Sequence, residues 1–163
     1  MRKGLIGGTA LVAVLAFAVS VAGCGSSSSS TTTTETTAAI TKAEFVAKGN
    51  AICVIADKAQ KAEINAYAKK LGLKENQEPT KAQQAELVEA VLAPNIQTQI
   101  DGVKALGAPS GEEQQVNSAL EASQQALNKV KANPELAFAK ESAFHAAGQQ
   151  LHALGLTKCA RNS

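Results

Sequence analysis

The chain has 163 residues, with 16 basic and 14 acidic side chains, and aromatic residues make up 3% of it. Proteins that bind nucleic acids carry clustered basic residues along the phosphates and, for single strands, aromatic rings on which bases stack. The sequence has no such cluster and few rings, so we expect no nucleic-acid binding.

The first 22 residues have the pattern of a secretory signal. Arg2 and Lys3 precede an uncharged apolar run over residues 5–22. The alternative is a transmembrane helix, because about 18 apolar residues is near the lower limit for spanning a bilayer. The residues from Val21 to Cys24 favour the signal. They are an aliphatic residue, two small residues and a cysteine.

This arrangement resembles the lipobox of bacterial lipoproteins. The resemblance implies a signal peptide over residues 1–23 that is cleaved off, and acyl chains such as palmitate on Cys24. One acyl chain binds a membrane only marginally, whereas the two chains of a diacylglyceryl group give stable anchoring. The expected location is therefore the extracytoplasmic face of the cell membrane. Removal of Arg2 and Lys3 leaves 14 basic and 14 acidic side chains (16 − 2 = 14).

Residues 24–39 follow as the lipidated cysteine and a Ser/Thr-rich linker with one charge, Glu35. A segment with so little apolar surface cannot order itself, so we expect a flexible tether. Residues 40–163 are long enough for one domain with a single core.

Helix signals in this domain are strong. Capping boxes at Thr41, Thr80 and Ser110 and an N-terminal proline after Asn133 mark four starts. Glycines 72, 107 and 155 occupy C′ positions. The expected helices span residues 42–71, 81–106, 111–132 and 134–154. This pattern predicts an all-α, four-helix up-down-up-down bundle.

Apolar stripes support these helices. The clearest is Val116, Leu120, Ser123, Leu127 and Val130. Pro94 lies inside the second helix and should bend it. Because the core residues are alanine-rich, we expect close helix packing and no large cavity.

A polar strip on the last predicted helix is the one candidate for chemistry. Glu141, His145, Gln149 and His152 follow one another at steps of 4, 4 and 3. Such a strip could bind a metal or haem, or form a proton-transfer pair. The alternative is a solvated edge with a weak ion pair. Tyr67 is a further candidate ligand, although its place on an apolar stripe favours a core-edge residue with a surface hydroxyl.

Cys53 and Cys159 remain once Cys24 is lipidated, and an oxidising compartment favours their pairing. If the last helix ends near the start of the first, the five-residue tail can reach Cys53. The expected disulfide is structural, since no Cys-x-x-Cys spacing is present. The alternative is a buried free thiol beside a disordered tail.

The stretches EFVAKGNAICVIAD and LGLTKCA resemble those of small secreted helical lipoproteins of actinobacteria, a group without an assigned activity. This resemblance implies the same compartment and cysteine pairing. Motifs for common catalytic and cofactor sites are absent, so we expect no enzyme and no resident cofactor. The favoured function is binding of a protein or cell-envelope partner. The alternative is a carrier of a small ligand, metal or haem on the helical strip, and a third hypothesis, a hydrolase or transferase, lacks a further catalytic group.

Overall fold

The computed structural model describes residues 39–74 and 77–162, which belong to one compact unit. The predicted signal peptide, Cys24 and almost all of the linker lie outside the described residues. In the described ranges the regular structure is helical and contains no strand, so the all-α class is confirmed. The elements in chain order are α1 (Lys42–Lys70), α2 (Lys81–Leu87), the π-helix η1 (Val88–Leu92), α3 (Ala93–Ala105), α4 (Glu113–Ala132), the 3-10 helix η2 (Pro134–Ala137), α5 (His145–Ala153) and the 3-10 helix η3 (Cys159–Asn162).

Two of the three predicted capping boxes are confirmed. Thr41 and Thr80 each accept a hydrogen bond from the backbone N–H three residues later, and the side chains of Glu44 and Gln83 accept the return bonds. The box at Ser110 is wrong. Gly111 has φ +83°, which is incompatible with a helical residue, so α4 begins only after Glu112 and has no side-chain cap.

The predicted glycine stops are confirmed at the ends of α1, α3 and α5. Gly72, Gly107 and Gly155 have φ values of 65°, 72° and 85°. A residue with a β-carbon rarely adopts this conformation, and glycine adopts it freely.

The second predicted helix contains a wider turn beside its proline. η1 lies between α2 and α3, and the N–H of Ala93 bonds to the carbonyl of Val88, five residues back. Pro94, which lacks an N–H, follows at once in the first turn of α3. The structure therefore shows a π turn where the sequence predicts a bend.

The prediction of one helix over residues 134–154 is wrong. Only η2 and α5 are helical there, and residues 138–144 form turns and bends between them. The Ser142 hydroxyl accepts a hydrogen bond from the N–H of Phe144 at 3.1 Å. Such a local bond competes with the helical one. The break lets Leu136 and Phe144 both pack against the core.

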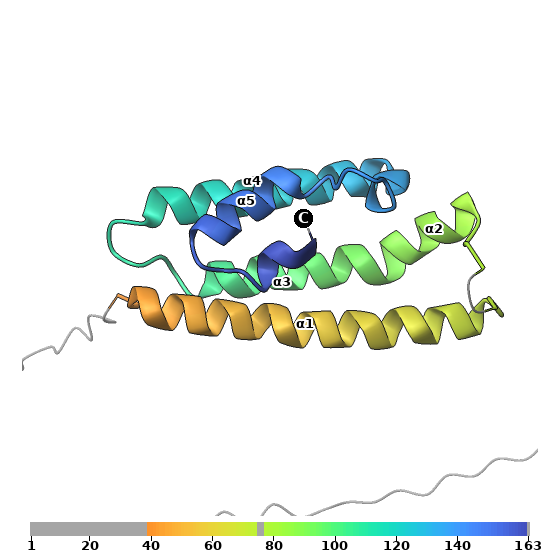
Figure 1. Cartoon of the computed structure of the whole chain (residues 1–163), viewed down its shortest axis with the longest axis horizontal. Coiled ribbons are helices and arrows are strands. Elements are labelled where there is room, and N and C mark those ends of the chain that lie inside the picture. The colour runs from red at the N-terminus through yellow and green to blue at the C-terminus, as the bar shows by residue number, and fades with distance from the viewer. Residues whose placement is uncertain (1–38, 75–76, 163) are drawn as a thin grey trace, which may run out of the picture. The chain divides into compact units, whose positions relative to one another are not determined.

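The elements pack in a chain of neighbours. α1 contacts α3, α3 contacts α4, α4 contacts α5, and η3 returns to α1 (Figure 1). The core lies between these elements, and every residue of the predicted stripe on α4 is buried. Among the described helices, none combines the length and apolar character needed to cross a membrane.

The capping pattern makes a matched pair of substitutions informative. Thr41→Ala removes a bond that satisfies the first turn of α1, so we expect a loss of about 0.5–2 kcal/mol of unfolding free energy. Ser110→Ala should change it by less than about 0.5 kcal/mol, because Ser110 caps no helix. Urea denaturation followed by circular dichroism measures both, and equal losses would contradict the assignment.

Candidate functional site

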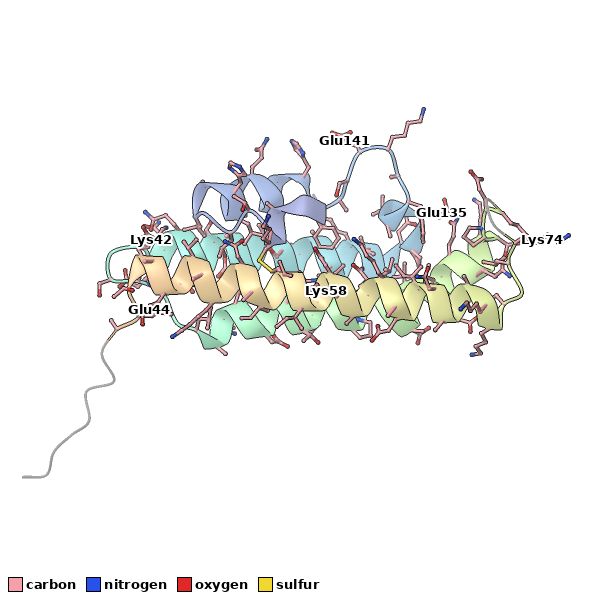
Figure 2. The ribbon with its side chains drawn as sticks, turned by 60° about the horizontal axis from the view of Figure 1, so that its bottom comes forward. Lys42, Glu44, Lys58, Lys74, Glu135 and Glu141 are labelled. Atoms are coloured by element: carbon pink, nitrogen blue, oxygen red, sulfur yellow. A yellow bond between two sulfur atoms is a disulfide. The ribbon has the colours of Figure 1, made fainter. Side chains whose placement is uncertain are left out.

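The residues of the predicted polar strip do not share one helix. Glu141 lies on the non-helical segment before α5 and projects into solvent (Figure 2), whereas His145 begins α5 and His152 lies in its last turn. Both histidines are exposed. The Gln149 amide nitrogen lies 3.0 Å from His145 Nε2. The prediction that Glu141 and His145 lie one helical turn apart is therefore wrong.

Tyr67 is buried on α1. The sequence predicts a hydroxyl at the surface, but the hydroxyl is buried as well. Its side chain is 8% exposed, and its Oη has no hydrogen-bond partner within the described ranges. Burial and, to a smaller extent, the nearby Glu86 carboxylate together raise the pKa of Tyr67 from 10.0 to about 12. In residues 39–74 and 77–162, no three His, Cys, Asp or Glu side chains are grouped to hold a metal ion.

The described domain contains a partly enclosed cavity of about 310 Å³. The expectation of a close-packed core without a large cavity is thus wrong. None of the residues of the predicted strip lines this space, and neither does Tyr67. Its lining comes from α1, η1, α3, α4, η2, α5 and the segments beside them: Cys53, Gln60, Leu92, Ile96, Gln99, Ile100, Val103, Leu120, Ser123, Val130, Leu136, Ala137, Ser142, Phe144, Ala147, Gly148, Leu151 and Cys159.

Small side chains on facing elements leave this space open. Ser123 on α4, Ala137 on η2, and Ala147 with Gly148 on α5 all line it. Nine of the lining residues are buried, and the other nine are half-buried: Gln60, Leu92, Ile96, Leu136, Ala137, Ser142, Phe144, Leu151 and Cys159.

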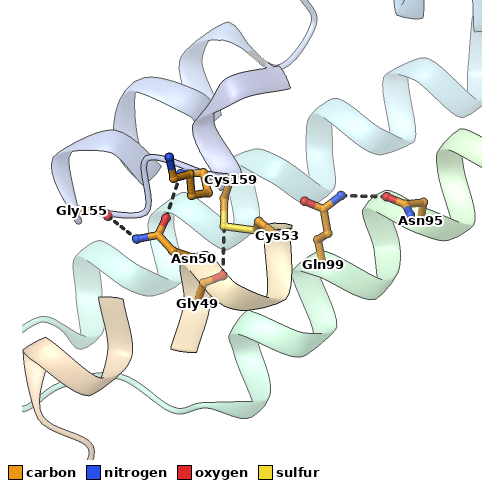
Figure 3. The surroundings of a disulfide bond; sticks show 8 residues. Gly49, Asn50, Cys53, Asn95, Gln99, Gly155 and Cys159 are labelled. Atoms are coloured by element: carbon orange, nitrogen blue, oxygen red, sulfur yellow. Dashed lines mark hydrogen bonds between the residues drawn. A yellow bond between two sulfur atoms is a disulfide. The ribbon is translucent and has the colours of Figure 1, made fainter. Parts of the chain in front are cut away.

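One wall of the cavity is fixed by a disulfide. Cys53 of α1 is bonded to Cys159 of the tail, with Cα atoms 5.1 Å apart, as the sequence predicts. Asn50, one turn earlier, donates to the Gly155 carbonyl at 2.9 Å and accepts from the Lys158 N–H at 2.8 Å (Figure 3). We define this set of contacts between α1 and residues 155–159 as the tail clasp.

Gly49 completes the tail clasp by leaving room for Leu156. A β-carbon at Gly49 would lie 2.6 Å from Leu156 Cδ2, and Leu156 is fully buried. Cys159 Sγ lies 3.5 Å from the Gly49 carbonyl oxygen. Because a disulfide sulfur carries no hydrogen, this is a packing contact.

Two buried polar side chains face the cavity. Gln99 is 8% exposed and donates through Nε2 to Asn95 Oδ1 at 2.8 Å, while Asn95 Nδ2 donates to the Ala56 carbonyl at 3.0 Å. Ser123 is 5% exposed and donates to the Ala119 carbonyl at 2.8 Å.

Sequence reasoning did not select Gln99 or Ser123 as site residues. The available signal was the serine within the otherwise apolar stripe of α4. A polar residue on a buried stripe needs a partner and is therefore informative.

The cavity suits a small, mostly apolar ligand. Its volume lies at the low end of the range for ligand pockets, and apolar walls with a few polar groups are typical of them. No Asp, Glu, Lys, Arg or His lines it. Comparisons of the chain with protein families, with curated proteins and with solved structures find no match.

Loss of the disulfide should destabilise the domain strongly. Replacing Cys53 and Cys159 by alanine releases a loop with a sequence separation of 106 residues. The chain-entropy argument gives a cost of up to about 4.7 kcal/mol for a loop of this size. Urea denaturation of the double variant against the oxidised protein measures this loss. Equal midpoints would show that the crosslink stabilises nothing.

Tyr67 is the only tyrosine of the chain, so its ionisation can be followed by tyrosinate absorbance alone. We expect a midpoint near pH 12 in the folded protein. Because the folded pKa is raised, the stability linked to Tyr67 is fully present below pH 10.0 and is lost as the pH rises towards 12. Tyr67→Phe should remove this component, and a midpoint at 10.0 in the folded protein would contradict it.

Proposed function

We propose that this protein is a lipid-anchored protein on the extracytoplasmic face of a bacterial cell membrane, and that its helical domain binds a small, mostly apolar molecule without converting it. The cavity of about 310 Å³ is the observation that carries this proposal. A hollow lined largely by aliphatic side chains stabilises an apolar ligand by removing its surface from water.

The anchor belongs to the same proposal. The residues from Val21 to Cys24 after an apolar run support lipidation of Cys24, and the Ser/Thr-rich composition of the linker supports a flexible tether. The disulfide adds support, because such bonds persist mainly outside the cytosol. We further propose that four helical segments run up-down-up-down: α1, then α2 with η1 and α3, then α4, then η2 with α5. The short connections between them favour antiparallel neighbours.

A protein or cell-envelope partner remains the second proposal. Large apolar side chains exposed in the described domain are Ile55 on α1, at 68%, and Phe138 before α5, at 42%. They lie on different segments, and single exposed apolar residues are common on surfaces without partners. The cavity is therefore the more specific feature.

Filling the cavity should weaken ligand binding strongly. Ala147 lines the cavity and is 2% exposed, so Ala147→Leu places about three extra carbon atoms in the space. Each lost methylene equivalent of burial is worth about 0.8 kcal/mol, so we expect naphthalene to bind well over tenfold more weakly. The folded state should keep its stability, since the new side chain occupies existing space.

Naphthalene fluorescence can be titrated with the purified full chain, which contains no tryptophan. Ala146→Leu is the matched control, because Ala146 is exposed on the same helix. Both variants contain the apolar run 5–22, so any naphthalene bound by that run contributes equally to the two measurements. Failure of the parent chain to bind naphthalene, or equal affinity of the two variants, would refute the proposed site.

A further inference from the structure

We infer that the ligand of this cavity is a neutral molecule that presents a hydroxyl group as a hydrogen-bond donor, and is not a carboxylate or other anion. The inference rests on the proposed function and specifies its ligand class. It follows from the direction of the hydrogen bonds that hold the buried polar side chains of the wall.

The orientation of Gln99 is set by a relay that begins at a backbone carbonyl. The Ala56 carbonyl can only accept, so the Asn95 group that faces it must be the NH₂. The other end of the Asn95 amide is then its oxygen, which also can only accept. Gln99 must therefore turn its NH₂ to Asn95. Reversing either amide would place two donors or two acceptors opposite each other and lose a hydrogen bond.

This relay leaves the Gln99 carbonyl oxygen for the cavity. Figure 3 shows Oε1 pointing away from Asn95, towards the side where Cys53 lies. Gln99 lines the cavity, and no hydrogen bond to its Oε1 occurs among the described residues. An amide oxygen that lines a cavity without a protein partner is an acceptor for a donor on the ligand.

Ser123 on the facing helix α4 also offers the cavity only an acceptor. Its single hydroxyl hydrogen goes to the Ala119 carbonyl, so only oxygen lone pairs remain. Both deeply buried polar side chains of the lining thus offer acceptors. A carboxylate also has only acceptors and would be buried without a cation, because no Lys, Arg or His lines the cavity.

The volume limits the size of the ligand. A 150 Å³ apolar cavity holds benzene, so about 310 Å³ has room for roughly twelve carbon atoms. A bicyclic phenol or a medium-chain alcohol fits this limit.

Naphthalene and three of its derivatives test the inference with the purified full chain at neutral pH. Naphthalene has no polar group, naphthol has a donor, methoxynaphthalene has an oxygen without a donor, and naphthoate is an anion. We expect naphthol to bind about three- to tenfold more tightly than naphthalene, the effect of one net hydrogen bond. Methoxynaphthalene should bind no more tightly than naphthalene, and naphthoate at least about tenfold more weakly.

Two variants separate the contribution of the acceptors to ligand affinity from the contribution of cavity shape. Gln99→Met keeps the side-chain length, and Ser123→Ala removes only a hydroxyl whose bond lies within α4. Each should reduce the advantage of naphthol over naphthalene. Naphthalene affinity should stay within about twofold, which shows that the cavity has formed. If Gln99→Met does not fold, Ser123→Ala still supplies the test.

The outcomes distinguish the two proposals. Naphthalene binding with a preference for naphthol supports both. Naphthalene binding with naphthoate or methoxynaphthalene as tight as naphthol overturns the donor preference and leaves the cavity function standing. Absence of binding by every probe overturns both.

Discussion

The attachment of the C-terminal tail to α1 is the constraint on which the cavity depends. Three residues on one face of α1 hold the tail. Gly49 leaves room for Leu156, and Asn50 bonds to the backbone of Gly155 and Lys158. Cys53 forms the disulfide to Cys159. α5 leads directly into this tail and packs on α4. The tail clasp thus closes the fold and fixes Cys53 and Cys159, two residues of the cavity wall.

The buried side chains of Asn95 and Gln99 are linked by hydrogen bonds into one chain that ends at the Ala56 carbonyl. Gln99 donates to the Asn95 oxygen and Asn95 donates to the Ala56 carbonyl, so both amide nitrogens and the Asn95 oxygen are paired. Asn95 sits just after the π turn and Pro94. The second helix therefore combines a backbone irregularity with a buried polar relay, and π turns are frequent at functional sites. The irregular turn and the polar wall of the cavity lie on the same stretch of chain.

Local signals in the sequence predicted much of the fold. The caps at Thr41 and Thr80 and the glycine stops depend on residues close in sequence, and they are confirmed. The long helix predicted over 134–154 was wrong because its periodic pattern reveals neither the local bond from the Phe144 N–H to Ser142 nor the packing of both Leu136 and Phe144 against the core. The disulfide followed from cysteine count and compartment. The cavity could not be predicted, because it arises where small residues from different elements face one another.

The energetics of the cavity connect the disulfide to the ligand. An empty space of about 310 Å³ would cost on the order of 7 kcal/mol at about 24 cal/mol per Å³. This cost is comparable to the total stability of a small domain. The crosslink offsets up to about 4.7 kcal/mol of it. Because the space is half-open, water or a ligand can enter it and lower this cost. Water bonds well to the two acceptors but poorly to the aliphatic walls. A ligand with one hydroxyl and an apolar body satisfies both, so it has an advantage over the water it displaces.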